Sequence, residues 1–87
     1  MLHDLKIWPE HYDVVVDGRK RFELRRDDRD FQVGDTLMLR EWCLETETYT
    51  GRSVLVRVAF VLREAEPFGL MEGFCAISIE LESEELP

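Results

Sequence analysis

The chain is poor in the residues from which most catalytic and metal sites are built. Its 87 residues include only two cysteines and two histidines, and no Cys or His pair has a spacing typical of metal ligands. A G-x-S-x-G nucleophile elbow and a glycine-rich phosphate loop are also missing. We therefore expect no metal site and no bound cofactor, and the commonest catalytic templates do not apply.

Long apolar runs are missing as well. The N-terminus has no apolar segment of the kind found in secretory signal peptides, and no stretch approaches the roughly 20 apolar residues of a membrane-spanning helix. Cys43 and Cys75 both fall in apolar or strand-like segments, so we expect two buried, reduced thiols. These features predict a cytoplasmic protein that makes no contact with a membrane.

Basic residues are scarce and unevenly placed. The chain has 11 basic and 19 acidic residues, a net charge of −8, whereas proteins that bind nucleic acid in general are usually basic. Six of the basic residues, with three acidic ones, lie between Arg19 and Arg29, while Glu80–Pro87 has four glutamates and no basic residue. Contact with nucleic acid is therefore expected only in the first of these stretches. The alternative for that stretch is a solvated strand whose charges pair across the sheet.

The length leaves room for one core, and an apolar content of 45% is ordinary for a globular domain. We expect a single domain over residues 1–87. Pro9 suits the first turn of a helix and Gly18 its end, which predicts a short helix between a first strand over 4–8 and a second over 20–27. Three further strands are expected over 36–43, 52–63 and 75–81.

Short strands separated by turn residues favour a mainly β (α+β) fold, a five-strand barrel with one short helix between strands 1 and 2. Alternate residues of a strand share a face, so Phe22 and Leu24 point one way and Glu23 and Arg25 the other. We assign Phe22 and Phe60 to the core. Two longer sets alternate toward the interior: Val54, Val56, Val58, Phe60 and Leu62, and then Cys75, Ile77, Ile79 and Leu81.

One stretch combines residues that can carry function, where the predicted helix ends and the second strand begins. Lys20 stands at this junction, and Glu23 and Arg25 share a face of the strand. Together they can hold a phosphate or a base edge, because an arginine bonds two acceptors and a carboxylate accepts from an exocyclic amine. Strict alternation places Lys20 on the opposite face. The site therefore requires Lys20 to precede the regular pairing or to lie at a bulge.

Gly18, Lys20, Glu23 and Arg25 match the G-x-K-x-x-E-x-R signature, and in this the chain resembles the ASCH domains, relatives of the PUA RNA-binding fold. Four further segments are similar to a small bacterial and phage branch of that superfamily with no assigned function: 10–12, 29–35, 69–74 and 76–79. The resemblance implies a PUA-like β-barrel, a cleft between helix and barrel lined by Lys20, Glu23 and Arg25, and a role in RNA binding.

Two alternatives to RNA binding stay open. Some ASCH-like proteins are similar to amidohydrolases, but these have a threonine nucleophile where this chain has Glu23, a poor substitute in amide cleavage. A hydrolase acting on RNA or on a modified nucleoside remains an alternative, with Lys20 and Glu23 as the candidate acid–base pair. The other alternative is a protein-interaction domain in which the charged motif is a structural salt-bridge cluster.

Three aromatic side chains, those of Trp8, Tyr12 and Trp42, can stack on a base as in proteins that read single-stranded RNA, although aromatics at a helix–sheet junction are more often core. The sequence therefore predicts an RNA- or nucleotide-binding module. Its expected ligand-binding residues are Lys20, Glu23, Arg25, Tyr12, Trp8 and Trp42.

Overall fold

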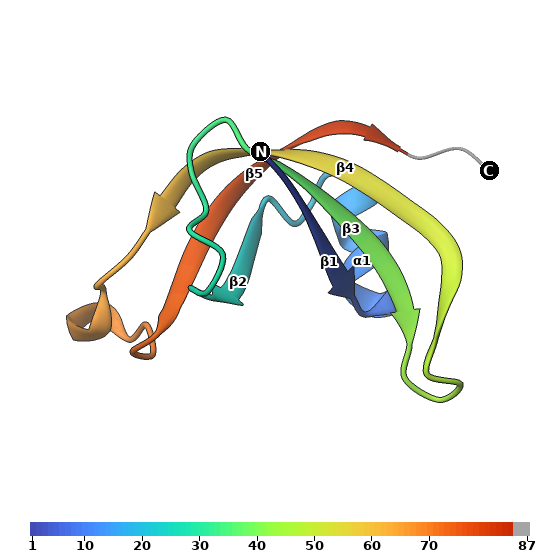
Figure 1. The fold of residues 1–87 in the computed structure, drawn as a ribbon, viewed down its shortest axis with the longest axis horizontal. Coiled ribbons are helices and arrows are strands. Elements are labelled where there is room, and N and C mark those ends of the chain that lie inside the picture. Colours follow the sequence, from blue (N-terminus) through green and yellow to red (C-terminus); the bar gives the residue numbers. More distant parts are fainter. Residues whose placement is uncertain (85–87) are drawn as a thin grey trace.

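The computed structural model describes residues 1–84, which form one curled sheet and one α-helix (Figure 1). The elements are β1 (Leu2–Ile7), α1 (Pro9–Val16), β2 (Phe22–Arg26), β3 (Thr36–Cys43), β4 (Thr48–Leu62), a 3-10 turn η1 (Glu66–Phe68) and β5 (Phe74–Glu84). The strand order is β1-β3-β4-β5-β2, with β1 parallel to β3 and every other pair antiparallel. The predicted mainly β fold with one helix between strands 1 and 2 is confirmed, as a half-barrel that stays open between β1 and β2.

Helix α1 lies under the arch of the sheet and packs against β3 and β5 (Figure 1). It begins at Pro9, as predicted, and the chain turns away at Gly18, whose φ of 85° lies in the left-handed region that glycine adopts without strain. Tyr12 and Val15 are buried on one face of the helix. Because a helix of eight residues is marginal on its own, this packing holds it in place.

The core fills the concave side of the sheet. Strand β3 contributes Leu37 and Leu39, which alternate as predicted. The remaining buried apolar members come from every other strand except β2, from α1 and from the loop after β2: Leu5, Ile7, Tyr12, Val15, Phe31, Val54, Val56, Val58, Cys75, Ile77 and Ile79. Their burial joins the two legs of the arch into one domain.

A β-bulge corrects the prediction for the second half of β4. Phe60 and Leu62 were expected inside, but they are 58% and 45% exposed. The pairing of β4 with β5 slips between Val58 and Phe60, and an extra residue in one strand moves every following side chain to the other face. Val61 packs against the core instead.

The face of β2 is also the reverse of the one expected. Phe22 is 50% exposed and Leu24 is 59% exposed, so the assignment of Phe22 to the core is wrong. Glu23 is buried, opposite Ile77 of β5. At this end of the sheet the interior therefore contains a carboxylate in place of an apolar side chain. Its ion-pair partners, Lys20 and Arg25, make this possible.

Two smaller predictions also need correction, those for Leu81 and for Cys43. Leu81 was placed in the inward set and is 49% exposed; it lies opposite Val56, just before a second irregularity in the β4–β5 pairing. Cys75 is buried, and burial raises the pKa of its thiol, whereas Cys43 is only half-buried. Hydrogen bonding to Thr46 lowers the pKa of the Cys43 thiol. Both cysteines are free.

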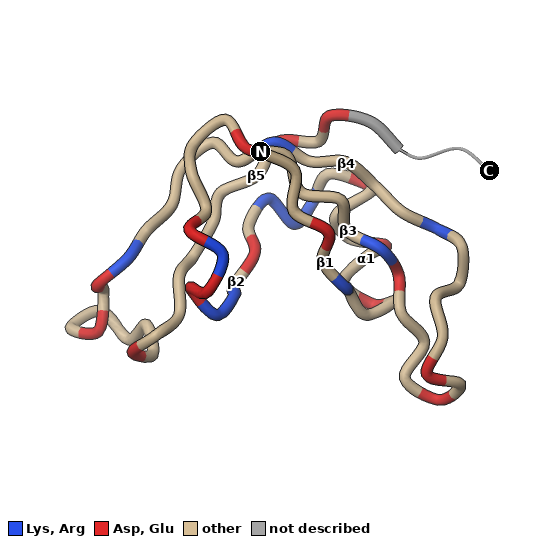
Figure 2. Tube along the Cα trace, viewed as in Figure 1, with Lys and Arg blue, Asp and Glu red and all other residues tan. Residues whose placement is uncertain are grey.

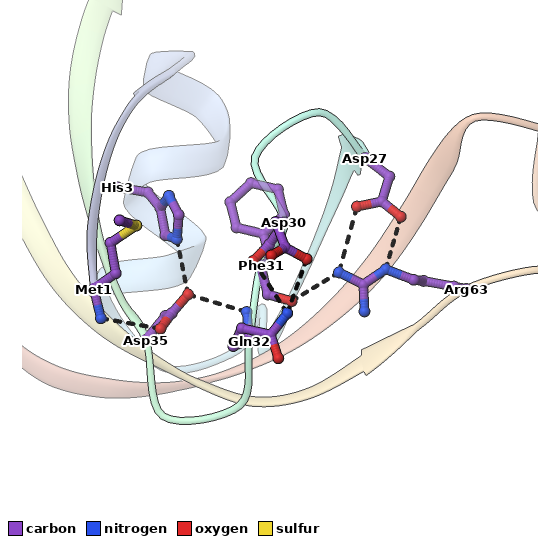
Figure 3. Close-up of polar contacts among 8 residues, drawn as sticks. All are labelled: Met1, His3, Asp27, Asp30, Phe31, Gln32, Asp35 and Arg63. Atoms are coloured by element: carbon purple, nitrogen blue, oxygen red, sulfur yellow. Dashed lines mark hydrogen bonds and ion pairs between the residues drawn. The ribbon is translucent and has the colours of Figure 1, made fainter.

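The loop between β2 and β3 is fixed to the sheet by two polar anchors (Figure 3). At one end, the Asp35 carboxylate bonds the His3 ring at 2.8 Å and the Met1 ammonium at 3.0 Å. At the other, Arg63 of the β4–β5 connection donates to Asp27 at 2.7 Å. These contacts hold the chain that follows β2 close to β1, the strand at the far edge of the sheet.

Candidate functional site

A cleft of about 440 Å³ opens along the gap between the two edges of the half-barrel. One wall is the end of β1, with Lys6 and Trp8, and His11 of α1 lies beside it. The opposite wall is the stretch from Lys20 to Arg25, which leads into and forms most of β2. The cleft therefore lies where the sheet fails to close, and the G-x-K-x-x-E-x-R stretch lines it.

Lys20, Glu23 and Arg25 converge in this cleft. The Lys20 ammonium donates to Glu23 Oε1 at 3.0 Å, and Arg25 donates to Glu23 Oε2 from Nε at 2.9 Å. Arg25 Nη2 also lies 2.8 Å from the same carboxylate oxygen. Because two cations neutralise it, the Glu23 side chain is stable at 4% exposure. This explains why β2 turns a charged face toward the interior.

The position of Lys20 meets the condition that strict alternation imposed. It lies before β2 begins at Phe22, in the turn that follows the helix. Its backbone N–H donates to the carbonyl of Val14 at 2.9 Å, and Gly18 donates to Val15 at 3.1 Å. The turn frees Lys20 from the pleat of the strand, so its side chain reaches the same carboxylate as Arg25.

Side chains rather than backbone pairing connect the two walls. Arg25 Nη2 donates to the carbonyl of Lys6 at 2.8 Å, and Arg29 Nη1 donates to that of Asp4 at 3.3 Å. Carbonyls of alternate residues point to the same side of a strand, so both acceptors belong to the free edge of β1. The arginines cover this edge and leave the cleft open between them and the helix.

The cleft is positive within an acidic chain. Figure 2 shows basic residues gathered along the chain that enters and leaves β2. The Lys20 and Arg25 cations and the Glu23 anion give the cleft a balance of +1, where the whole chain carries −8. An ammonium has three N–H donors and Glu23 takes one from Lys20, while Arg25 retains the donors of Nη1. The site therefore offers hydrogen-bond donors to a ligand rich in acceptors.

The three aromatic residues expected at the site are split by the structure. Trp8 lines the cleft and is 49% exposed, with its ring centroid 6.1 Å from that of His11. Tyr12 is 1% exposed in the core and donates its hydroxyl to the Ser53 carbonyl. Trp42 lies outside the lining residues, packed edge-on to Tyr49 at 4.9 Å.

Sequence reasoning missed five lining residues: Lys6, Ile7, His11, Phe22 and Leu24. Phe22 faces the other way from Glu23, but β2 is an edge strand of the sheet, so the exposed Phe22 side chain still borders the opening. Lys6 turns its ammonium to the Trp42 ring, 3.8 Å from the centroid. His11 belongs to the segment 10–12 that carries part of the resemblance, and no pattern in the sequence placed it beside β2.

Within residues 1–84, neither α1 nor any other helix has the length and apolar character needed to span a membrane. In the same part of the chain, no three His, Cys, Asp or Glu side chains are arranged to hold a metal ion.

Comparison with known proteins gives a match over nearly the whole chain. The model of a family described as a domain of unknown function, DUF3850, matches residues 2–79, which include every residue lining the cleft. An uncharacterised 12.9 kDa protein in the GpA 3′ region of Escherichia phage P2 is 40% identical over 60 residues. These residues are 69% of this chain and 53% of the phage protein, so the chain spans about half the length of the curated relative it matches.

Proposed function

The chain belongs to the DUF3850 family, and we propose that its cleft binds single-stranded RNA or a nucleotide, with Lys20 and Arg25 as the principal contacts. The observation that carries this proposal is that two cations, held by one buried carboxylate, direct further donors into an open cleft. Phosphate and base carbonyl oxygens are acceptors of the kind that such donors bind.

In this proposal Glu23 positions the two cations. Both of its carboxylate oxygens already accept charge-assisted bonds, one from Lys20 and one from Arg25. The carboxylate therefore holds the two cations in place before a ligand arrives, which lowers the entropic cost of binding. The other role considered for Glu23 was to accept a hydrogen bond from a base amine. This role is less favoured, because both carboxylate oxygens already accept bonds from the cations.

The walls of the cleft suit a base. The Trp8 and Phe22 side chains both line it and are about half exposed, and base–aromatic stacking tolerates any sequence. A volume of about 440 Å³ lies within the usual range for small-ligand sites and is too small for a folded RNA. We infer that one nucleotide enters the cleft, either free or as part of a single strand.

The finer family assignment is part of the same proposal. The G-x-K-x-x-E-x-R residues line a cleft between helix and sheet, which supports a place for this chain among the ASCH, PUA-like domains. The relative from phage P2 supports a role inside bacterial cells, in the cytoplasm, during or alongside phage growth. RNA is present there in single-stranded form.

The test is a titration of short labelled oligoribonucleotides and of free nucleotides at two salt concentrations. Hydrogen bonds to charged groups contribute about 1.5–3 kcal/mol, so Lys20→Ala and Arg25→Ala should each weaken binding roughly 10- to 100-fold. Affinity should also fall as salt rises. Arg19→Ala is the matched control, because the Arg19 side chain is 75% exposed, pairs with Asp17 and does not line the cleft.

Two results would contradict the proposal. One is a wild-type chain that binds none of the probes at low salt. The other is an Arg25 variant that binds as well as the Arg19 variant. If the Arg25 variant then proved less stable to urea, the motif would have the purely structural role of a salt-bridge cluster.

A hydrolase acting on RNA or on a modified nucleoside is the second candidate function. It is favoured by one distance, the 3.0 Å between Lys20 Nζ and Glu23 Oε1, since both groups line the same cleft. Such a pair can exchange a proton with a substrate. Chromatography of each probe after prolonged incubation decides between the two, because binding without turnover rejects the enzyme.

A further inference from the structure

The outer face of the sheet carries a second feature, an apolar surface that borders the cleft at Phe22 and Leu24 and continues away from it to Phe60 and Leu62 of β4. Two apolar rows cross β4, β5 and β2, and each has a large, a small and a large residue. The rows are Phe60–Ser78–Phe22 and Leu62–Ala76–Leu24. The four large side chains are 58%, 50%, 45% and 59% exposed in that order, which makes a contiguous apolar patch on one face.

The patch results from the two features that sequence reasoning missed. The bulge after Val58 turns Phe60 and Leu62 outward, and the burial of Glu23 turns Phe22 and Leu24 outward. The small residues of β5 then form a shallow groove between two ridges. Neighbouring strands lie about 4.8 Å apart, so each ridge is one strand spacing from the groove.

A charged row borders the patch. Arg57 of β4 is paired in register with Glu80 of β5, and both are exposed. Within the chain Arg57 contacts Glu82 at 3.4 Å, a surface pair of little energetic value. Next to the apolar rows there is therefore one positive charge on β4, the strand that forms a ridge, and one negative charge on β5, the strand that forms the groove.

We propose that this face joins two copies of the chain in a two-fold dimer. A two-fold axis parallel to the strands, between β4 and β5, places β4 of each copy over β5 of the other. Phe60 of each copy then lies over the Ser78 position of its partner and Leu62 over Ala76, while Arg57 meets Glu80. Large residues fill the groove, opposite charges meet, and each contact occurs twice, as an isologous interface requires.

The patch is small, so the dimer is weak. Four half-exposed side chains provide less than the roughly 800 Å² per partner of a standard interface. Each copy also carries −8, and this repulsion opposes association until salt screens it. Association should therefore strengthen as salt rises, opposite to the salt dependence expected of RNA binding. The dimer does not depend on the proposed function of the cleft.

Sedimentation equilibrium of the full chain tests the proposal, at protein concentrations from about 10 μM to about 1 mM and at low and high salt. We expect the average mass to rise from one copy toward two, more steeply at high salt. Leu62→Glu should leave a monomer throughout. Leu44→Glu is the matched control, because Leu44 is 53% exposed in the β3–β4 turn, outside the rows, and this variant should dimerise like the wild type.

A charge exchange tests the arrangement itself and covers the case in which the Leu62 variant does not fold. Arg57→Glu and Glu80→Arg should each weaken dimerisation roughly 5- to 10-fold, and the double exchange should restore it. The proposal is overturned by a wild-type chain that stays monomeric or grows beyond two copies. The proposal is also overturned if Leu44→Glu dissociates the dimer as much as Leu62→Glu does, or if the double exchange of Arg57 and Glu80 fails to restore the dimer.

Discussion

Glu23 and Glu41 are buried to the same degree, each 3% exposed, yet they belong to regions of opposite character. Glu23 is bound by two cations, Lys20 and Arg25, in an open cleft. Glu41 accepts from Thr50 and from Arg52, and Arg52 also reaches a second carboxylate, Asp13 of the helix. The first cluster has one positive charge more than negative ones, and the second has one fewer.

The comparison shows that a buried carboxylate does not by itself mark a functional site. Bonds from Arg52 and Thr50 lower the pKa of Glu41, so this carboxylate stays ionised as part of the packing between β3 and β4. Glu23 is buried to the same degree as Glu41, but the cations bound to it, Lys20 and Arg25, have further N–H donors that face the cleft. Surplus donors at an opening distinguish the candidate binding site from the structural ion pair.

The largest effect that separates the two regions is expected from Arg52→Met. The change leaves Glu41 buried without its cation, which should cost about 3 kcal/mol in the free energy of unfolding measured with urea. It also removes the guanidinium that lies 4.5 Å from the Tyr12 ring. RNA affinity should stay within about twofold of the wild type, because no residue of this cluster lines the cleft.

Arg40→Met provides the control for this change. Arg40 pairs with Asp4, and the two side chains are 37% and 49% exposed, so the loss should be below about 1 kcal/mol. An Arg52 variant as stable as the Arg40 variant would remove the distinction between a sealed and an open cluster.

How far the sequence could predict this architecture depends on whether a residue acts locally. Pro9 and Gly18 set the ends of the helix through their own backbone preferences, and both were read correctly. The strand over 36–43 was predicted to its last residue, because Leu37 and Leu39 follow strict alternation. Such signals need no information from the rest of the chain.

The two errors of face have a common cause, a choice made by partners distant in sequence. Alternation fixes which residues share a face of β2 but not which face is inside, and that choice depends on Lys20 and Arg25 neutralising Glu23. The bulge after Val58 depends on how β4 meets β5. The sequence of neither strand by itself indicates that β4 has an extra residue in its pairing with β5. The outer face therefore could not be predicted from the sequence.

A second effect concerns Asp35, which is buried like Glu41 and lies outside the cleft. Hydrogen bonding to His3, followed by the N–H of Gln32, lowers the pKa of Asp35 from 3.8 to about 2. A carboxylate with a lowered pKa stabilises the fold fully above its unfolded pKa and loses that contribution as pH falls through the folded one. At 1.36 kcal/mol per pKa unit, up to about 2 kcal/mol should disappear between about pH 4 and pH 2.

The measurement is the free energy of unfolding against pH, for the wild type and for Asp35→Asn. The variant should be less stable at neutral pH and should lose less stability on going from pH 4 to pH 2. Asp17→Asn is the comparison, since Asp17 is a half-exposed partner of Arg19 and should leave the wild-type slope unchanged. Equal slopes in all three proteins would mean that His3 and Asp35 contribute no pH-dependent stability.

The smallest effect contrasts the two tryptophans, which the sequence treated alike and the structure separates. Trp8 lines the cleft, whereas Trp42 packs against Tyr49 and Lys6. Stacking contributes about 1–3 kcal/mol per base, and because Phe22 on the opposite wall can also stack, we expect the lower end, a loss of roughly fivefold in RNA affinity for Trp8→Ala. Trp42→Ala should change the affinity less than twofold.

Fluorescence gives an independent reading, because the chain has only these two tryptophans. In Trp42→Phe the emission comes from Trp8 alone and should be quenched as RNA is added, in proportion to the fraction bound. In Trp8→Phe the remaining Trp42 should report no change while binding persists. Quenching of Trp42 but not of Trp8 would show that the ligand binds at the β3–β4 hairpin and not in the cleft. The further donors of Lys20 and Arg25 would then have no role in binding.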